Sequence, residues 1–239
     1  MKKLLLVVLI TMYLCPKTTH SQEGAAAAGI VGGLVAIGIG IAAVEQMKES
    51  AELTATQWVL TNRPELENFS LKTLAFNGKK LKDMSAATVI TFKIQEFTPQ
   101  DKPELDGKKQ VLFGFTSHGW INQYGIDFEK VRWYLVDSEE WINMMVAYAS
   151  LSSPIKDKSN LEDILAQGKI VNTGVRVGGK LEVPFFKLSG DMYVVSDYSS
   201  QMKLIYNERS LGIFLKETSD LVQIGRGDII DIHQFFFEN

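Results

Sequence analysis

Apolar residues are distributed unevenly along this chain, and the first apolar run differs from everything that follows it. The basic pair Lys2 and Lys3 precedes an apolar run over residues 4–14, in which only Thr11 and Tyr13 are less apolar. That run is too short to span a bilayer, because a spanning helix needs about 20 residues. Polar and small residues then lead to Gln22, as at a cleavage site. The pattern predicts a signal peptide over residues 1–21, of the kind that directs export in bacteria.

The single cysteine, Cys15, lies at the end of this run. A lipid-attached cysteine occupies such a place, but the residue before it is Leu14, where lipidation favours a small residue. Lipidation of Cys15 is therefore the weaker alternative to cleavage. With one cysteine the chain can form neither a disulfide within itself nor a cysteine-rich metal site.

The second apolar segment, residues 24–44, has 21 residues without a charge and lies between Glu23 and Glu45. This length matches the hydrocarbon core of a bilayer. Small residues recur in it every four positions, a pattern typical of membrane helices that associate closely. These helix-packing candidates are Ala28, Gly29, Gly32, Gly33, Ala36 and Gly40. We expect a membrane helix with a glycine zipper, and the alternatives are a flexible linker or a core element.

Helical spacing of apolar residues continues beyond this segment. Ala51, Ala55 and Val59 recur on one face, while acidic residues occupy the other. Pro64 ends the pattern, because the residue before a proline avoids the helical region. We therefore predict an amphipathic stalk helix over residues 45–63, whose apolar stripe docks on the domain that follows.

Residues 69–239 show the pattern of a mostly antiparallel α+β domain. One main helix is predicted to begin at Asp137, with Glu140 as its capping-box partner, and a short helix covers residues 160–166. Strands are expected where β-prone residues alternate or cluster between turn signals. They cover residues 69–76, 79–82, 89–94, 110–116, 169–177, 180–188, 192–196, 202–207, 210–217, 221–224 and 229–237. Short strands around one main helix are typical of the α+β class.

Candidate chemistry is sparse. His118 is the one weak catalytic candidate, since it adjoins Ser117, but neighbouring residues of a strand point to opposite faces. The sequence shows no metal-ligand spacing, so we expect no metal and no cofactor. Removal of residues 1–21 would take away three lysines and no acid, and would change the formal net charge from −3 to −6. Such a chain has no basic excess for a phosphate backbone, so we expect no nucleic acid partner.

Aromatic residues are dense between Phe113 and Tyr148, with nine in 36 residues against 24 in the whole chain of 239. Most residues of this kind fill a core, and that is the interpretation we prefer. The alternative is a binding surface, for which Trp120, Tyr124 and Trp133 are the candidates.

These patterns together favour an exported, membrane-associated protein of the bacterial cell envelope, on a periplasm-facing or outer membrane. Its α+β domain would serve assembly or partner binding and would not be an enzyme. The expected partners are membrane lipid and either further copies of this chain or another membrane protein. Two alternatives stay open: a secreted or periplasmic hydrolase that uses His118, and an outer-membrane β-barrel suggested by the many short strands.

Overall fold

The computed structural model describes residues 41–75, 87–117, 120–122, 125–188 and 193–238. In these ranges the chain forms four α-helices and antiparallel sheets, which confirms the α+β class. The predicted signal peptide lies outside the described residues, as do the helix-packing candidates Ala28, Gly29, Gly32, Gly33, Ala36 and Gly40. None of the helices in the described part combines the length and the apolar character that crossing a bilayer requires.

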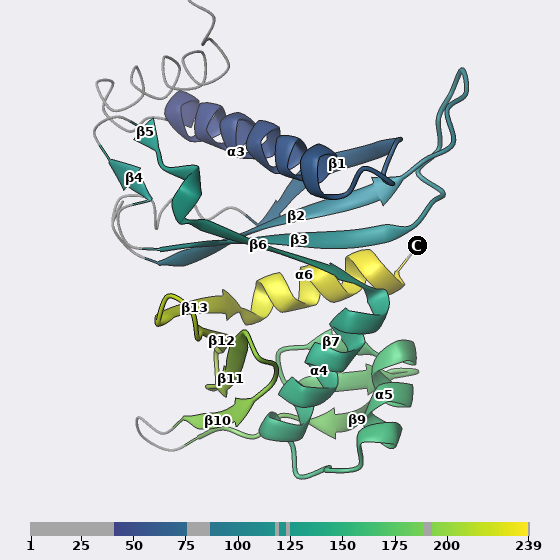
Figure 1. Cartoon of the computed structure of the whole chain (residues 1–239). Coiled ribbons are helices and arrows are strands. Elements are labelled where there is room, and N and C mark those ends of the chain that lie inside the picture. The colour runs from purple at the N-terminus through teal and green to yellow at the C-terminus, as the bar shows by residue number, and fades with distance from the viewer. Residues whose placement is uncertain (1–40, 76–86, 118–119, 123–124, 189–192, 239) are drawn as a thin grey trace, which may run out of the picture.

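The first sheet has the order β1-β2-β3-β6, and neighbouring strands are antiparallel. Its strands are β1 (Phe69–Ala75), β2 (Thr88–Glu96), β3 (Lys109–Thr116) and β6 (Val131–Asp137). One face is covered by helix α3 (Ile41–Asn62), and the C-terminal helix α6 (Arg226–Phe237) lies across the other face (Figure 1). The small elements β4 (Ile121–Asn122), β5 (Gly125–Ile126) and η2 (Phe128–Lys130) connect β3 to β6.

Alternation along these strands divides their side chains between two cores. Phe92 and Leu112 pack on the α3 side, whereas Val111 and Phe113 belong to the larger core around α6 and the second half of the chain. Successive strand residues point to opposite faces, so a strand buried on both faces reads as a continuous apolar run. The run Val111–Phe115 in β3 is such a case, since each of its non-glycine side chains is buried.

Helix α3 docks on the first sheet as the sequence predicted. Its stripe residues Ala51, Ala55 and Val59 are buried against the sheet. The Trp58 ring stacks on Trp133 of β6 with 6.0 Å between ring centroids. The helix ends directly before the Arg63-Pro64 step, which confirms the predicted stop.

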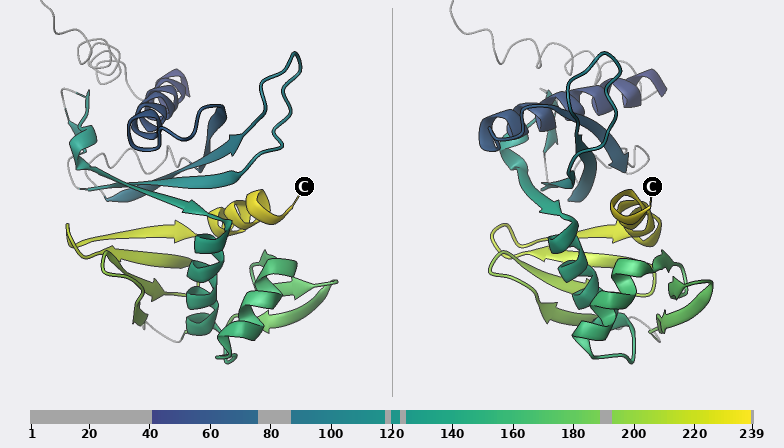
Figure 2. Two further views of the ribbon diagram at one scale, coloured as in Figure 1. Left: turned by 45° about the vertical axis from the view of Figure 1, so that its right-hand side comes forward. Right: turned by 90° about the vertical axis from the view of Figure 1, so that its right-hand side faces the viewer.

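Between β6 and α6 the chain forms two further sheets and two helices (Figure 2). Helix α4 runs from the end of β6 down between the two sheets, and α5 packs beside it. The helices are α4 (Ser138–Ser152) and α5 (Lys158–Gln167). The three-stranded sheet contains β7 (Lys169–Val171), β8 (Gly174–Val177) and β9 (Lys180–Pro184). The four-stranded sheet contains β10 (Val194–Asp197), β11 (Met202–Tyr206), β12 (Ser210–Leu215) and β13 (Asp220–Gly225).

The predicted N-cap of α4 is present. The carboxylate of Asp137 accepts a hydrogen bond of 3.0 Å from the backbone N–H of Glu140. The Glu140 side chain takes a different role from the expected capping box. Its Oε1 accepts hydrogen bonds from the phenols of Tyr134 at 2.9 Å and Tyr198 at 2.7 Å, so it joins β6, α4 and the segment after β10.

Two of the predicted strands were wrong. Residues 229–237, expected as a strand, belong to helix α6, whose buried residues Ile229, Ile232, His233 and Phe236 follow helical spacing. Residues 169–177, expected as one strand, form the β7–β8 hairpin. The turn ends at Gly174, which has a φ of 145°, where an added Cβ would lie 2.0 Å from the carbonyl oxygen of Val183. Only glycine fits this position.

Candidate functional site

The sequence-predicted site residues do not converge. His118 and Tyr124 lie outside the described residues. The Trp120 side chain is 2% exposed and belongs to the core on the α3 side. Trp133 is half-buried between Trp58 and Phe92, with ring centroids 6.0 Å away in both cases.

The aromatic-rich segment mostly fills the core, as expected. Its fully buried members are Phe113, Phe115, Trp120, Trp141 and Tyr148. No group of three or more His, Cys, Asp or Glu side chains suited to a metal ion occurs in the part of the chain that the structure describes.

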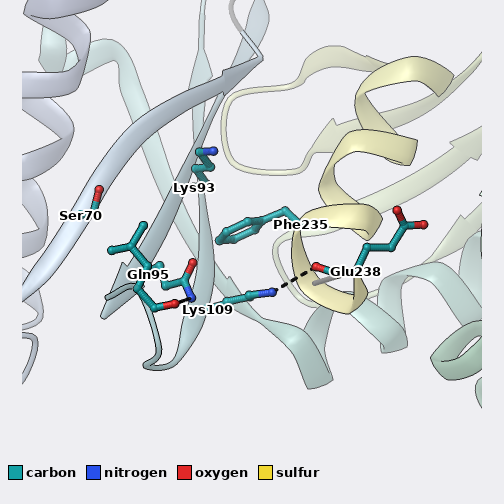
Figure 3. A pocket seen from close by; sticks show the side chains of 7 residues that line it. Ser70, Lys93, Gln95, Lys109, Phe235 and Glu238 are labelled. Atoms are coloured by element: carbon teal, nitrogen blue, oxygen red, sulfur yellow. Dashed lines mark hydrogen bonds between the residues drawn. The ribbon is translucent and has the colours of Figure 1, made fainter. Parts of the chain in front are cut away.

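The feature best suited to binding is a pocket of about 440 Å³ between the first sheet and the end of α6 (Figure 3). We call it the lysine pocket, because two lysines from neighbouring strands line it. Its lining residues are Ser70, Lys93, Gln95, Leu105, Lys109, Phe235 and Glu238. Cavities of this size accommodate a small ligand or one or two side chains of a partner.

Strand register places the polar residues of the lysine pocket side by side. Ser70 of β1 lies opposite Gln95 of β2, and Gln95 lies opposite Lys109 of β3. In the next row on the same face, Lys72 of β1 lies directly opposite Lys93 of β2. Three lysines therefore share one corner of the sheet, on the face opposite α3.

Lys109 is held in place by the end of α6. Its Nζ lies 5.6 Å from the centroid of the Phe235 ring, in a cation–π arrangement. The same ammonium donates a hydrogen bond of 3.4 Å to the backbone oxygen of Glu238. Lys93 is exposed and has no hydrogen bond or ion pair with another described residue. The pocket therefore contains the positioned ammonium of Lys109 and the ammonium of Lys93, which retains all three of its hydrogen-bond donors.

Two other polar groups of the pocket wall, those of Glu238 and Gln95, are engaged within the protein. The Glu238 carboxylate forms an ion pair of 2.6 Å with Lys169 of β7. The Gln95 amide nitrogen donates a hydrogen bond of 2.5 Å to the carbonyl oxygen of Leu105. Ser70 has no hydrogen bond to either lysine among the described contacts, and covalent catalysis needs a nucleophile in contact with its base. The arrangement favours the binding of an anion over a reaction.

Two other pockets, each of about 400 Å³, are less suitable. The first lies between β6 and the β12–β13 turn, where Arg132 and Glu217 form an ion pair of 3.3 Å across it. The second is lined by Arg226, whose guanidinium already donates to the carbonyl oxygen of Asn172 at 2.6 Å and to the phenol of Tyr148 at 3.1 Å. In both pockets the principal cation is bound by the protein itself.

The most strongly perturbed titratable groups lie outside the lysine pocket and have structural contacts. Burial, and then the hydrogen bond to Glu140, raise the pKa of Tyr134 to about 12. The same two causes raise the pKa of Tyr198. Burial lowers the pKa of His233, whose Nδ1 accepts a hydrogen bond from Trp141. These groups connect helices and strands, and Tyr134 also lines the pocket between β6 and the β12–β13 turn.

Sequence analysis missed every residue of the lysine pocket. The only local signal was the presence of exposed lysines within strands, Lys93 in β2 and Lys72 in β1. Comparison with known proteins provides no further guide. The chain matches no protein family model, and no curated protein and no solved structure is significantly similar to it.

Proposed function

We propose that this chain is an exported, membrane-associated envelope protein whose α+β domain binds a partner and has no catalytic role. The observation that carries the proposal is that residues 41–44, the end of the apolar Gly/Ala segment, belong to α3. Helix α3 begins at Ile41, within the apolar residues 24–44, and continues without a break to Asn62 on the sheet. A membrane helix over residues 24–44 would therefore lead directly into an element packed on the domain.

The packing of α3 supports a firm connection between such a helix and the domain. The buried alanines of the α3 stripe pack on the sheet, and Glu52 of α3 contacts β1. Its Oε1 accepts hydrogen bonds from the backbone N–H and the hydroxyl of Thr73 at 2.8 and 2.7 Å. Burial alone would raise the pKa of Glu52, but the two Thr73 hydrogen bonds and the charges of Lys72 and Lys48 together lower it. Glu52 is therefore a charged acceptor that fixes the position of the helix along β1.

The location of the lysine pocket supports the binding part of the proposal. Helix α3 covers one face of the first sheet, whereas Lys93 and Lys109 lie on the opposite face beside α6 (Figures 1 and 3). An anchor joined through α3 would leave this pocket uncovered. The domain could therefore bind a partner while it is held at a membrane.

Self-association is the third part of the proposal. The small residues at four-residue intervals, among them Gly32, Ala36 and Gly40, would allow two membrane helices to approach closely. The expected assembly is a homo-oligomer or a pair with another membrane protein, in a periplasm-facing or outer membrane.

Fractionation tests the proposal in cells. The full chain and a variant lacking residues 24–44 are expressed from the same promoter, and the membrane and soluble fractions are separated after alkaline carbonate extraction. We expect the full chain in the membrane pellet, with a mature N-terminus at Gln22 by N-terminal sequencing, and the deletion variant in the supernatant. Recovery of the full mature chain in the supernatant would refute the membrane association.

A further inference from the structure

We infer that the lysine pocket binds a carboxylate attached to an apolar group. This inference rests on the proposed function, in which the domain binds a partner, and it names the chemistry that the pocket would recognise. The carboxylate would be bound by the ammonium groups of Lys93 and Lys109, and the apolar group would pack beside Phe235. The ligand could be an acidic segment of a polypeptide or a free carboxylic acid.

Positive charge gathers at this corner of the sheet, although the charge of Lys72 also interacts with the Glu52 carboxylate. Lys72 and Lys93 lie directly opposite each other on neighbouring antiparallel strands, and Lys109 lies on the next strand. Like charges at directly opposite positions destabilise a sheet. A bound carboxylate would relieve this repulsion.

The acids near the pocket do not neutralise Lys93 and Lys109. The Glu238 carboxylate is engaged by Lys169 at 2.6 Å. Leu105 is the only residue between β2 and β3 that lines the pocket, and its acidic neighbours Glu104 and Asp106 do not. The corner is therefore basic within a chain whose formal net charge is −3.

Part of the pocket wall is apolar. Phe235 and Leu105 line the pocket together with the lysines, and the Leu105 side chain is 52% exposed. Figure 3 shows the Phe235 ring lying between Lys93 and Lys109. An inorganic ion would use only the ammonium groups, whereas a ligand with a carboxylate and an apolar group would also cover the half-buried ring and the exposed leucine.

Lys109 has a fixed position at the pocket wall. Its contacts with the Phe235 ring and with the Glu238 backbone oxygen hold the ammonium at the pocket wall before any ligand arrives. A positioned group loses less side-chain entropy on binding, so its contribution to affinity is larger. Lys93, exposed and without a described partner, can reorient to complete the site.

Calorimetric titration of the full mature chain in a neutral detergent tests the inference. The probe is N-acetylphenylalanine, and N-acetylphenylalaninamide is its uncharged counterpart. We expect the carboxylate probe to bind and Lys93→Gln to raise its Kd about 10-fold. The exposed Lys180 of β9 lies outside the pocket, so Lys180→Gln should leave the Kd unchanged. Absence of carboxylate binding, equal binding of the amide, or an equal effect of both variants would overturn the inference.

Two further titrations define the ligand. Inorganic phosphate should compete at least 10-fold more weakly than N-acetylphenylalanine, and equal competition would contradict the apolar half of the site. A hexapeptide of alternating Phe and Glu, compared with one of alternating Phe and Gln, distinguishes the sources. If the acidic peptide binds at least 10-fold more tightly than N-acetylphenylalanine, the ligand is a polypeptide. If the two bind with equal affinity, the ligand is a free carboxylic acid. Both outcomes agree with the inference. A chain that stays in the membrane fraction but binds no carboxylate would refute this inference alone.

Discussion

The indole N–H of Trp141 donates a hydrogen bond of 3.2 Å to Nδ1 of His233, and both side chains are buried. Because Nδ1 is the acceptor, the proton of the neutral ring lies on Nε2, which donates to the carbonyl oxygen of Gly168 at 3.0 Å. One imidazole therefore joins α4, α6 and the end of α5. Protonation of His233 would remove the acceptor that Trp141 uses.

This contact predicts a loss of stability in mild acid. Burial lowers the pKa of folded His233 below its ordinary value of 6.5, so the unfolded chain binds the proton more readily. The stabilising contribution is full above pH 6.5 and is lost as the pH falls towards the folded-state pKa. The free energy of unfolding, measured by urea denaturation from pH 7.5 to 5, should fall less steeply for His233→Gln than for the wild type. Parallel curves would contradict the assigned protonation state.

A second prediction concerns Glu140, which accepts hydrogen bonds from both Tyr134 and Tyr198. Glu140→Ala would leave two half-buried phenols without this acceptor and should cost about 1–3 kcal/mol of stability. The neighbouring Glu139 is exposed, so Glu139→Ala is the matched control and should change stability by less than about 0.5 kcal/mol. Equal effects of the two variants in urea denaturation would rule out the role assigned to Glu140.

The same variant should change the titration of Tyr134. The pKa of Tyr134 is raised to about 12, first by burial and then by its contact with Glu140. Removal of the carboxylate should lower this pKa only part of the way to 10, because the burial stays. An ultraviolet titration that compares Glu140→Ala with Glu140→Ala plus Tyr134→Phe isolates this phenol. An unchanged Tyr134 pKa would contradict the predicted contribution of Glu140.

A third prediction tests the docking of α3. Ala55 is fully buried between the helix and the sheet, so Ala55→Leu would overpack the interface and cost about 1–3 kcal/mol. Gln57 lies on the exposed side of the same helix, and Gln57→Leu should be nearly neutral. Tryptophan fluorescence should also change in Ala55→Leu, because Trp58 stacks on Trp133 at this interface. If both variants are as stable as the wild type, α3 does not pack tightly on the sheet in solution.

The fourth prediction uses glycines of the β7–β9 sheet. Gly174 combines a φ of 145° with a close approach to Val183, so Gly174→Ala should cost more than about 2 kcal/mol. Gly178 has a φ of 53°, and nothing lies within 4 Å of an added Cβ. Gly178→Asn should therefore be tolerated to within about 1 kcal/mol, because asparagine adopts this conformation more readily than other residues do. Thermal unfolding of the two variants, compared with the wild type, is the measurement, and equal destabilisation would contradict the hairpin geometry.

Much of the fold was predictable because its signals are local. Alternation marked β2, and a cluster of β-prone residues after a turn signal marked β3. The Asp137 cap marked the start of α4, and Pro64 marked the end of α3. Helix α6 was missed because Ile229, Ile230 and its terminal phenylalanines are strongly β-prone. The buried residues of α6 nevertheless follow helical spacing, and this spacing was the better guide.

The lysine pocket could not be predicted from the sequence. Its residues come from β1, β2, the β2–β3 loop, β3, and α6 with its C-cap, and Ser70 and Phe235 are far apart in the chain. The pairing of Lys72 with Lys93 depends on the register of two strands, and each lysine alone resembles an ordinary solvated residue. The position of Phe235 depends on α6, which the sequence pattern indicated as a strand. Only the tertiary structure brings these groups together.

Vesicle flotation with the purified mature chain tests the central claim, association with a membrane, most directly. The chain, exchanged from neutral detergent into phospholipid vesicles, should rise with the vesicles in a density gradient and stay with them after a wash with high salt. A variant in which Leu34 and Ile37 of the apolar segment are both replaced by lysine should stay at the bottom, because each buried charge opposes insertion by about 2.5–3.5 kcal/mol. A folded wild-type chain that stays at the bottom of the gradient would contradict the account.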